Sequence, residues 1–249
     1  MEIIRTKSFE LAVRTAGDSR SPKLALVMPG RLDTKDYANN ISHIQYLSTL
    51  GYYAVSFDPP GTWESPGGIE LFTTTNYIKA VHELIELYKN KPTLLFGHSR
   101  GGTVAMLAGT SNPHVTHIIA AMSYYGAPSA PSHEARELGY QIEMRDMPPG
   151  IMVDSPHQKR FQLPIAYFED GAQYDAAKMI KVSKIPKLYF YGSHDAETDP
   201  TDVKKLYEFS AEPKAIHELN SGHSYWQTPG AVDEVNEAIR KFLENTNRQ

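Results

Sequence analysis

The chain has 249 residues, of which 41% are hydrophobic and 22% are charged, and it contains no cysteine. Disulfides, thiolate catalysis and cysteine-based zinc sites are therefore excluded. The formal charge of −4 argues against nucleic acid as the main partner, because phosphate binding favours a basic surface. The length suits one medium-sized α/β domain whose core needs no covalent or metal support.

The first residues, Met1 to Arg5, lack the basic-then-apolar layout of a signal peptide. The apolar runs are too short for a membrane span. We therefore expect a soluble, cytoplasmic protein whose partner is a small molecule, and whether it forms a homodimer is left open.

Strands and helices alternate along most of the chain. We expect strands at 2–5, 8–15, 24–28, 52–57, 93–97, 115–123, 187–191 and 214–219. We expect helices at 36–50, 70–88 and 102–108, and a C-terminal helix with one apolar face formed by Val232, Val235, Ile239, Phe242 and Leu243. This alternation predicts an α/β fold with a mostly parallel, twisted sheet of about eight strands and helices on both faces.

Residues 126–183 interrupt this alternation, since they are rich in proline, methionine, histidine and charged side chains. Short helices are expected near 132–145 and 172–181, with no strong strand between them. The segment is too long for a simple connection in a compact domain, which indicates a lid or cap. We therefore divide the chain into a core, residues 1–125 and 184–249, and a cap insertion, residues 126–183.

The pentapeptide Gly97-His98-Ser99-Arg100-Gly101 lies between an expected buried strand and an expected helix. This G-x-S-x-G pattern is typical of the nucleophile elbow, a sharp turn that lifts a serine hydroxyl above the sheet. Glycines on either side of the serine remove Cβ atoms that would collide in so tight a turn.

The sequence resembles the α/β-hydrolases over nearly the whole chain outside residues 126–183. In that family an acid and then a histidine follow the nucleophile along the chain. The resemblance implies Ser99 as nucleophile, Asp195 as acid and His223 as base, the last two each in a loop after an expected strand. Asp199 and Asp202 are rivals for the acid, but Asp199-Pro200 is more typical of a helix start.

The resemblance also implies an oxyanion hole made by the backbone amides of Arg100 and Arg31. Pro29-Gly30-Arg31 departs from the His-Gly that usually precedes the second donor, so Leu32 remains an alternative to Arg31. Residues 58–65 resemble the family's D-x-x-G-x-G-x-S loop, with Trp63 in place of the second glycine.

We expect Trp63, Tyr124 and Trp226 to contribute to the substrate pocket. His194 and Asp195 are adjacent, but no helical metal-ligand spacing is present, so we expect no metal. No G-x-G-x-x-G or phosphate-binding loop is present either, and no cofactor is indicated.

The function that this resemblance implies is that of a carboxylesterase-like serine hydrolase. It would form an acyl-enzyme on small or medium-sized carboxylic esters, with amides, thioesters and lactones also open. The same three residues also serve non-hydrolytic reactions in this fold, namely perhydrolysis, acyl transfer and carbon–carbon cleavage. A ligand-binding or receptor protein on the same fold is a further alternative, because the fold does not determine the substrate.

Overall fold

The main sheet of this computed structural model, which describes residues 2–150 and 157–246, has eight strands in the spatial order β1-β2-β4-β3-β5-β6-β9-β10. Their bounds are β1 (Glu2–Arg5), β2 (Glu10–Ala16), β3 (Lys23–Met28), β4 (Tyr52–Phe57), β5 (Thr93–His98), β6 (Val115–Ala121), β9 (Lys187–Gly192) and β10 (Lys214–Leu219). β2 pairs antiparallel with both β1 and β4, and the other neighbouring strands run parallel. The expected mostly parallel sheet is confirmed.

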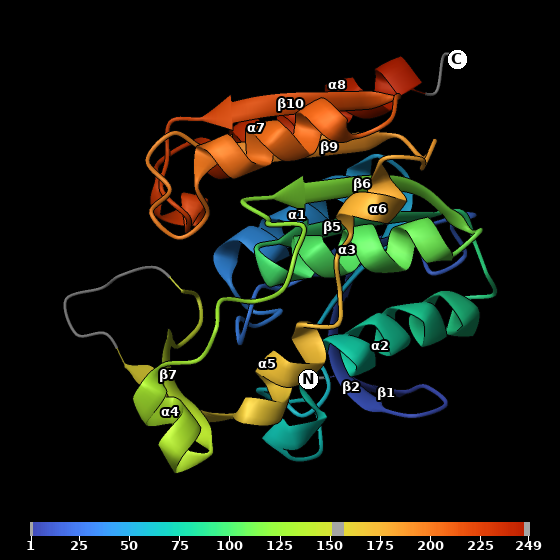
Figure 1. The fold of residues 1–249 in the computed structure, drawn as a ribbon. Helices are drawn as coiled ribbons and strands as arrows, with labels where there is room; N and C mark the ends of the chain where they lie inside the picture. The colour runs from blue at the N-terminus through green and yellow to red at the C-terminus, as the bar shows by residue number, and fades with distance from the viewer. Residues whose placement is uncertain (1, 151–156, 247–249) are drawn as a thin grey trace.

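Helices cover both faces of this sheet (Figure 1). Successive residues of β3 point to opposite faces, so Leu24 and Leu26 belong to one apolar cluster while Ala25 and Val27 belong to another. The first cluster includes side chains of α2, α3 and α7, and the second includes side chains of α1 and α8. The bounds are α1 (Ala38–Thr49), α2 (Thr74–Leu87), α3 (Arg100–Ser111), α7 (Pro200–Phe209) and α8 (Ala231–Thr246).

Two short 3₁₀ helices, η1 (Ile69–Leu71) and η2 (Tyr225–Gln227), complete the core. η1 divides the helix expected at 70–88, because α2 begins only after Thr73, whose side chain accepts a hydrogen bond from the Asn76 amide. A threonine that satisfies a free amide in this way defines the start of a helix.

The insertion between β6 and β9 contains a short helix within the expected 132–145, but that helix ends at Leu138, and the two-stranded antiparallel sheet that follows contradicts the expectation of no strong strand. Its elements are α4 (His133–Leu138), β7 (Tyr140–Asp146), β8 (Gln158–Pro164), α5 (Ile165–Gly171) and α6 (Ala177–Ile180). Ile142 and Met144 of β7 are exposed, whereas Glu143 between them is buried. The apolar side chains thus face outward. A prediction that expects the apolar residues of a strand to be buried therefore misses β7.

The helix expected at 172–181 is also wrong in its extent, because α5 ends at Gly171 and α6 begins only at Ala177. Figure 1 shows β7 and α4 on the side of the molecule to which the arrowheads of β6 and β10 point. The insertion therefore lies beyond the carboxyl ends of the parallel strands, where open α/β sheets place their functional groups.

Candidate active site

Ser99 occupies the turn between β5 and α3 in a strained backbone conformation, with φ 51° and ψ −122°. Residues other than glycine rarely adopt a positive φ, and strain of this kind clusters at functional sites. The flanking glycines are required by space: a Cβ on Gly101 would lie 2.3 Å from the Met28 carbonyl oxygen, and one on Gly97 would lie 2.2 Å from the Gly101 carbonyl carbon. The turn therefore has the geometry expected of the elbow.

The structure brings Ser99, His223 and Asp195 together from the ends of three strands. The Ser99 hydroxyl lies 2.9 Å from His223 Nε2, and His223 Nδ1 lies 2.9 Å from Asp195 Oδ2 and 3.1 Å from Oδ1. With the proton on Nδ1, the imidazole donates to the carboxylate and accepts from the serine. These contacts form the hydrogen-bonded chain that activates a serine nucleophile in known hydrolases.

Asp195 is held in place by its own loop. Its side chain is buried, and Oδ1 accepts hydrogen bonds from the amides of Glu197 (2.8 Å) and Thr198 (2.9 Å). The rival Asp199 accepts from the Thr201 amide at the start of α7. The expectation that Asp199 begins a helix is confirmed, and of the acid candidates only Asp195 contacts His223 within the described residues.

The carboxylate and the imidazole each change the pKa of the other. Burial tends to raise the pKa of Asp195, but the hydrogen bond and the charge of His223, with the two amides, lower it overall. Burial tends to lower the pKa of His223, yet the hydrogen bond and charge of Asp195 raise it above its ordinary value of 6.5. The carboxylate therefore stays ionised at neutral pH, while the imidazole titrates above the usual range.

The loop after β3 is fixed by two side chains that bind its carbonyl oxygens. Arg145 Nε, from β7 of the insertion, donates to the Arg31 carbonyl (2.9 Å), and Trp63 Nε1 donates to the Leu32 carbonyl (2.7 Å). In residues 2–150 and 157–246, the amides of Arg31 and Arg100 have no protein hydrogen-bond acceptor. The Arg31 amide in this loop and the Arg100 amide at the start of α3 are therefore able to donate to a ligand.

A cavity of about 590 Å³ contains Ser99 and His223 and lies between the core and the insertion. Tyr124 and Trp226 line it as expected, but Trp63 is not among its described lining residues. Trp63 instead packs its ring against Phe161 of β8, with 5.5 Å between ring centroids. The hydrogen bond from the Trp63 indole to the Leu32 carbonyl, in the loop after β3, explains this position.

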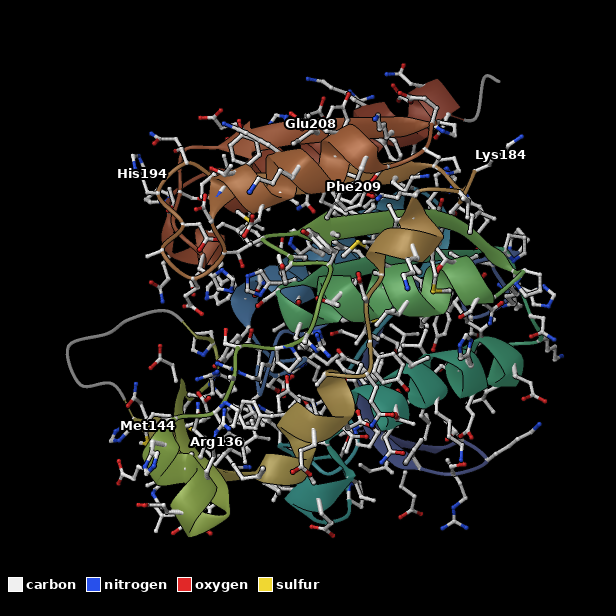
Figure 2. The ribbon with its side chains drawn as sticks, in the orientation of Figure 1. Arg136, Met144, Lys184, His194, Glu208 and Phe209 are labelled. Carbon is white, nitrogen blue, oxygen red and sulfur yellow. The ribbon has the colours of Figure 1, made fainter. Side chains whose placement is uncertain are left out.

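The cavity wall is strongly charged, which the sequence reasoning did not anticipate. Figure 2 shows Met144 of β7 and His194 of the loop after β9 near the carboxyl-end side of the molecule, on the two segments that flank the cavity. Charged side chains that line it include Arg31, Asp33, Arg100, Glu143, Arg145 and Glu197. A purely apolar acyl pocket therefore does not describe this site.

Asp33 is one of the residues that the sequence reasoning missed. Its Oδ2 lies 3.5 Å from His98 Nδ1, its Oδ1 lies 3.7 Å from Arg145 Nε, and His98 Nε2 lies 3.0 Å from the His223 carbonyl oxygen. Burial tends to raise the pKa of Asp33, but these neighbours lower it overall. The only feature of the sequence that could have indicated Asp33 was its position two residues after Arg31, in the loop after β3.

In the described part of the chain, no group of three or more histidine or acidic side chains is placed to hold a metal ion. No helix there is both long and apolar enough to cross a membrane.

A family model described as "alpha/beta hydrolase fold" matches residues 26–146, which include the turn at Ser99 and the loop after β3. A search of curated proteins with the sequence found no match. Similar solved structures include Est1E from Butyrivibrio proteoclasticus bound to ferulic acid, at 16% identity over all of both chains, with a TM-score of 0.77.

The structures of two other proteins extend this likeness. GrgF, an alpha/beta hydrolase from Penicillium sp. sh18, is 18% identical over 98% of this chain and 97% of its own, with a TM-score of 0.77. The Paleococcus ferrophilus monoacylglycerol lipase is 21% identical over 94% of this chain and 98% of its own, with a TM-score of 0.71. The chain therefore has the α/β-hydrolase fold.

Proposed function

We propose that this protein is a serine hydrolase that cleaves carboxylic esters with small or medium-sized acyl groups through an acyl-enzyme. The observation that carries the proposal is the continuous chain of short contacts from the Ser99 hydroxyl through His223 to Asp195. The similar structures include proteins named as a lipase and an enol-lactonase, and these names favour ester-type substrates.

In the proposed reaction, His223 Nε2 takes the proton of Ser99 as the hydroxyl oxygen attacks the ester carbonyl carbon. The amides of Arg100 and Arg31 receive the negative charge that develops on the carbonyl oxygen, and the charge of Asp195 stabilises the imidazolium. His223 then gives its proton to the departing alkoxide, which leaves as the alcohol. A water molecule repeats the sequence on the acyl-enzyme and releases the carboxylic acid.

A covalent probe tests this proposal directly. We expect a fluorophosphonate to label the folded protein once, with the adduct mapped by mass spectrometry to the peptide that contains Ser99. The same protein is expected to hydrolyse 4-nitrophenyl butyrate, and prior labelling should abolish that activity. Labelling at another serine, or no turnover of any ester in a broad panel, would contradict the proposal.

The activity is expected to fall on acidification, because only neutral His223 accepts the serine proton. Asp195 raises the pKa of His223 above 6.5, so the acid limb of kcat/KM should have its midpoint above that pH. Activity then increases as the pH rises through this pKa, while Asp195 stays ionised throughout. The measurement is kcat/KM from pH 5 to 9, and a flat profile would show that His223 is not the base.

A further inference from the structure

The main chain of His223 is held by the side chain of His98. His98 is the last residue of β5, is 4% exposed, and its Nε2 lies 3.0 Å from the His223 carbonyl oxygen. Among residues 2–150 and 157–246, no other donor reaches this carbonyl, and the His223 amide has no hydrogen-bond acceptor. A carbonyl oxygen only accepts, so a proton of His98 is assigned to Nε2. Within that part of the chain, one hydrogen bond therefore fixes the backbone of the proposed base.

The rest of the loop leaves His223 room to move. Gly222 precedes it, and a Cβ built there would meet the His194 carbonyl oxygen at 3.7 Å, an ordinary contact. Glycine also gives the backbone a wide choice of conformations. After His223 the chain is anchored again, because the Tyr225 hydroxyl lies 2.6 Å from the ring of His43. The position of His223 therefore depends on the hydrogen bond from His98.

Asp33 lies on the other side of the His98 ring. Its Oδ2 faces His98 Nδ1 at 3.5 Å, close enough for an ion pair when the ring is protonated. Gly30 leaves the space in which the two meet, since a Cβ there would lie 2.5 Å from Asp33 Oδ2 and 3.1 Å from His98 Nδ1. Trp226 packs on the same ring, with 4.9 Å between centroids. The loop after β3 is thus connected through the His98 imidazole to the loop that carries His223.

We propose that His98 is a positioning residue for the base: its Nε2 fixes the main chain of His223, and Asp33 fixes the His98 ring. His223 Nε2 must stay within hydrogen-bond reach of Ser99 while Nδ1 keeps its contact with Asp195. A displacement of about 1 Å in such an arrangement can lower the rate by about 100-fold. The inference rests on the proposed function, which makes His223 the base.

Two uncharged residues at position 98 separate the hydrogen bond from packing. His98→Gln keeps a nitrogen donor that can reach the His223 carbonyl, whereas His98→Leu fills a similar volume without a donor. We expect His98→Leu to lower kcat for ester hydrolysis about 10- to 100-fold and to change KM less than about twofold, because the loss falls on the transition state. His98→Gln is expected to recover most of that loss. A packing role would make leucine serve at least as well as glutamine, and that result would overturn the proposal.

The pKa of His223 provides a readout that needs no turnover. Burial tends to lower this pKa, but the hydrogen bond and charge of Asp195, with the charges of Glu197 and Asp33, raise it overall. From β5, His98 also faces His223, with 4.8 Å between ring centroids. A displaced imidazole has a weaker hydrogen bond to Asp195, so its pKa should be lower.

NMR titration of protein with isotope-labelled histidine measures this pKa, and the signal of His223 is identified by its loss in His223→Gln. We expect a lower pKa of His223 in His98→Leu than in His98→Gln, and an acid limb of kcat/KM displaced in the same direction. Position 98 is uncharged in both variants, so a charge on the His98 ring does not contribute to the difference. Equal pKa values in the two variants would overturn the proposal.

Thermal unfolding reports whether each variant folds. If His98→Leu does not fold, His98→Asn takes its place, because its amide is one methylene too short to reach the His223 carbonyl. We then expect His98→Asn to have the lower kcat and the lower pKa of His223. Values equal to those of His98→Gln would overturn the proposal.

A double-mutant cycle tests the part played by Asp33. Asp33→Ala is expected to lower kcat about tenfold in the unmodified protein and much less in His98→Leu, because residues that act through one another are not additive. If the two losses multiply in full, Asp33 acts through a different contact, and its part of the proposal is overturned.

The two proposals fail separately. If esters are hydrolysed and the variants at position 98 match in kcat and in the pKa of His223, the proposed hydrolase stands and the positioning role fails. If no ester is hydrolysed while the pKa values differ as expected, the hydrolase fails and the hold of His98 on His223 stands.

Discussion

Ser99→Ala is expected to lower kcat for ester hydrolysis by roughly 10⁶-fold, the loss seen when a serine nucleophile is removed from such an arrangement. The substitution deletes the attacking oxygen and the 2.9 Å contact with His223, but it leaves the backbone turn in place. Alanine at φ 51° carries about the same strain as serine, so we expect the thermal unfolding temperature to be nearly unchanged. The comparison is made by single-turnover and steady-state assays alongside circular dichroism.

Ser56→Ala is the matched control for this variant. Ser56 lies on β4, is fully buried, and its hydroxyl has no hydrogen-bond partner in the described residues. The control therefore makes the same chemical change in the same sheet, away from the cavity, and should retain kcat within about twofold, as expected for a substitution outside the reacting groups. If Ser99→Ala kept more than a few per cent of the activity while folded, another group would be the nucleophile.

Asp195→Asn is expected to lower kcat by roughly 10⁴-fold while leaving the fold intact, as the corresponding change does in a serine protease. The introduced amide donates a hydrogen bond to His223 Nδ1, so the imidazole carries its proton on Nε2 and cannot accept the serine proton. The negative charge that raises the pKa of His223 is lost as well. The residual activity should therefore show an acid limb shifted to lower pH.

Asp199→Asn is the matched control for the Asp195→Asn variant. Asp199 begins α7 and accepts from the Thr201 amide, and asparagine caps helices about as well as aspartate. We expect this variant to lose less than about tenfold in kcat and to keep the position of its acid limb, because the change does not touch His223. If Asp199→Asn were the more damaging of the two, the assignment of the acid would be reversed.

The sequence predicted those parts of the site that depend on local turns. Ser99, Asp195 and His223 each lie in a loop after a strand, and the three strands run parallel, so their carboxyl ends meet at one edge. The need for glycine at positions 97 and 101 could also be predicted from the sequence, because the elbow turn is too tight to accommodate a Cβ atom at either position. Strand direction accounts for the meeting of these loops, whereas the choice of Asp195 and His223 came from the resemblance to the α/β-hydrolases.

The strands of the insertion could not be predicted from the sequence, for a different reason. β7 places Ile142 and Met144 on its exposed face and Glu143 on its buried face, so the burial pattern of a strand is inverted. The inner face lines a charged cavity rather than an apolar core, and no rule based on apolar burial detects such a strand. The contacts of Arg145 depend on where this insertion lies, so this residue was not singled out.

The hydrogen bond from Arg145 Nε to the Arg31 carbonyl oxygen constrains protein engineering. It makes the insertion and the catalytic scaffold structurally interdependent, so the segment between β6 and β9 is not an exchangeable module. A chimaera that took this segment from a relative without an arginine at the same place would leave the carbonyl unsupported. Such a graft is expected to slow the reaction as well as alter selectivity, so rate and selectivity would have to be redesigned together.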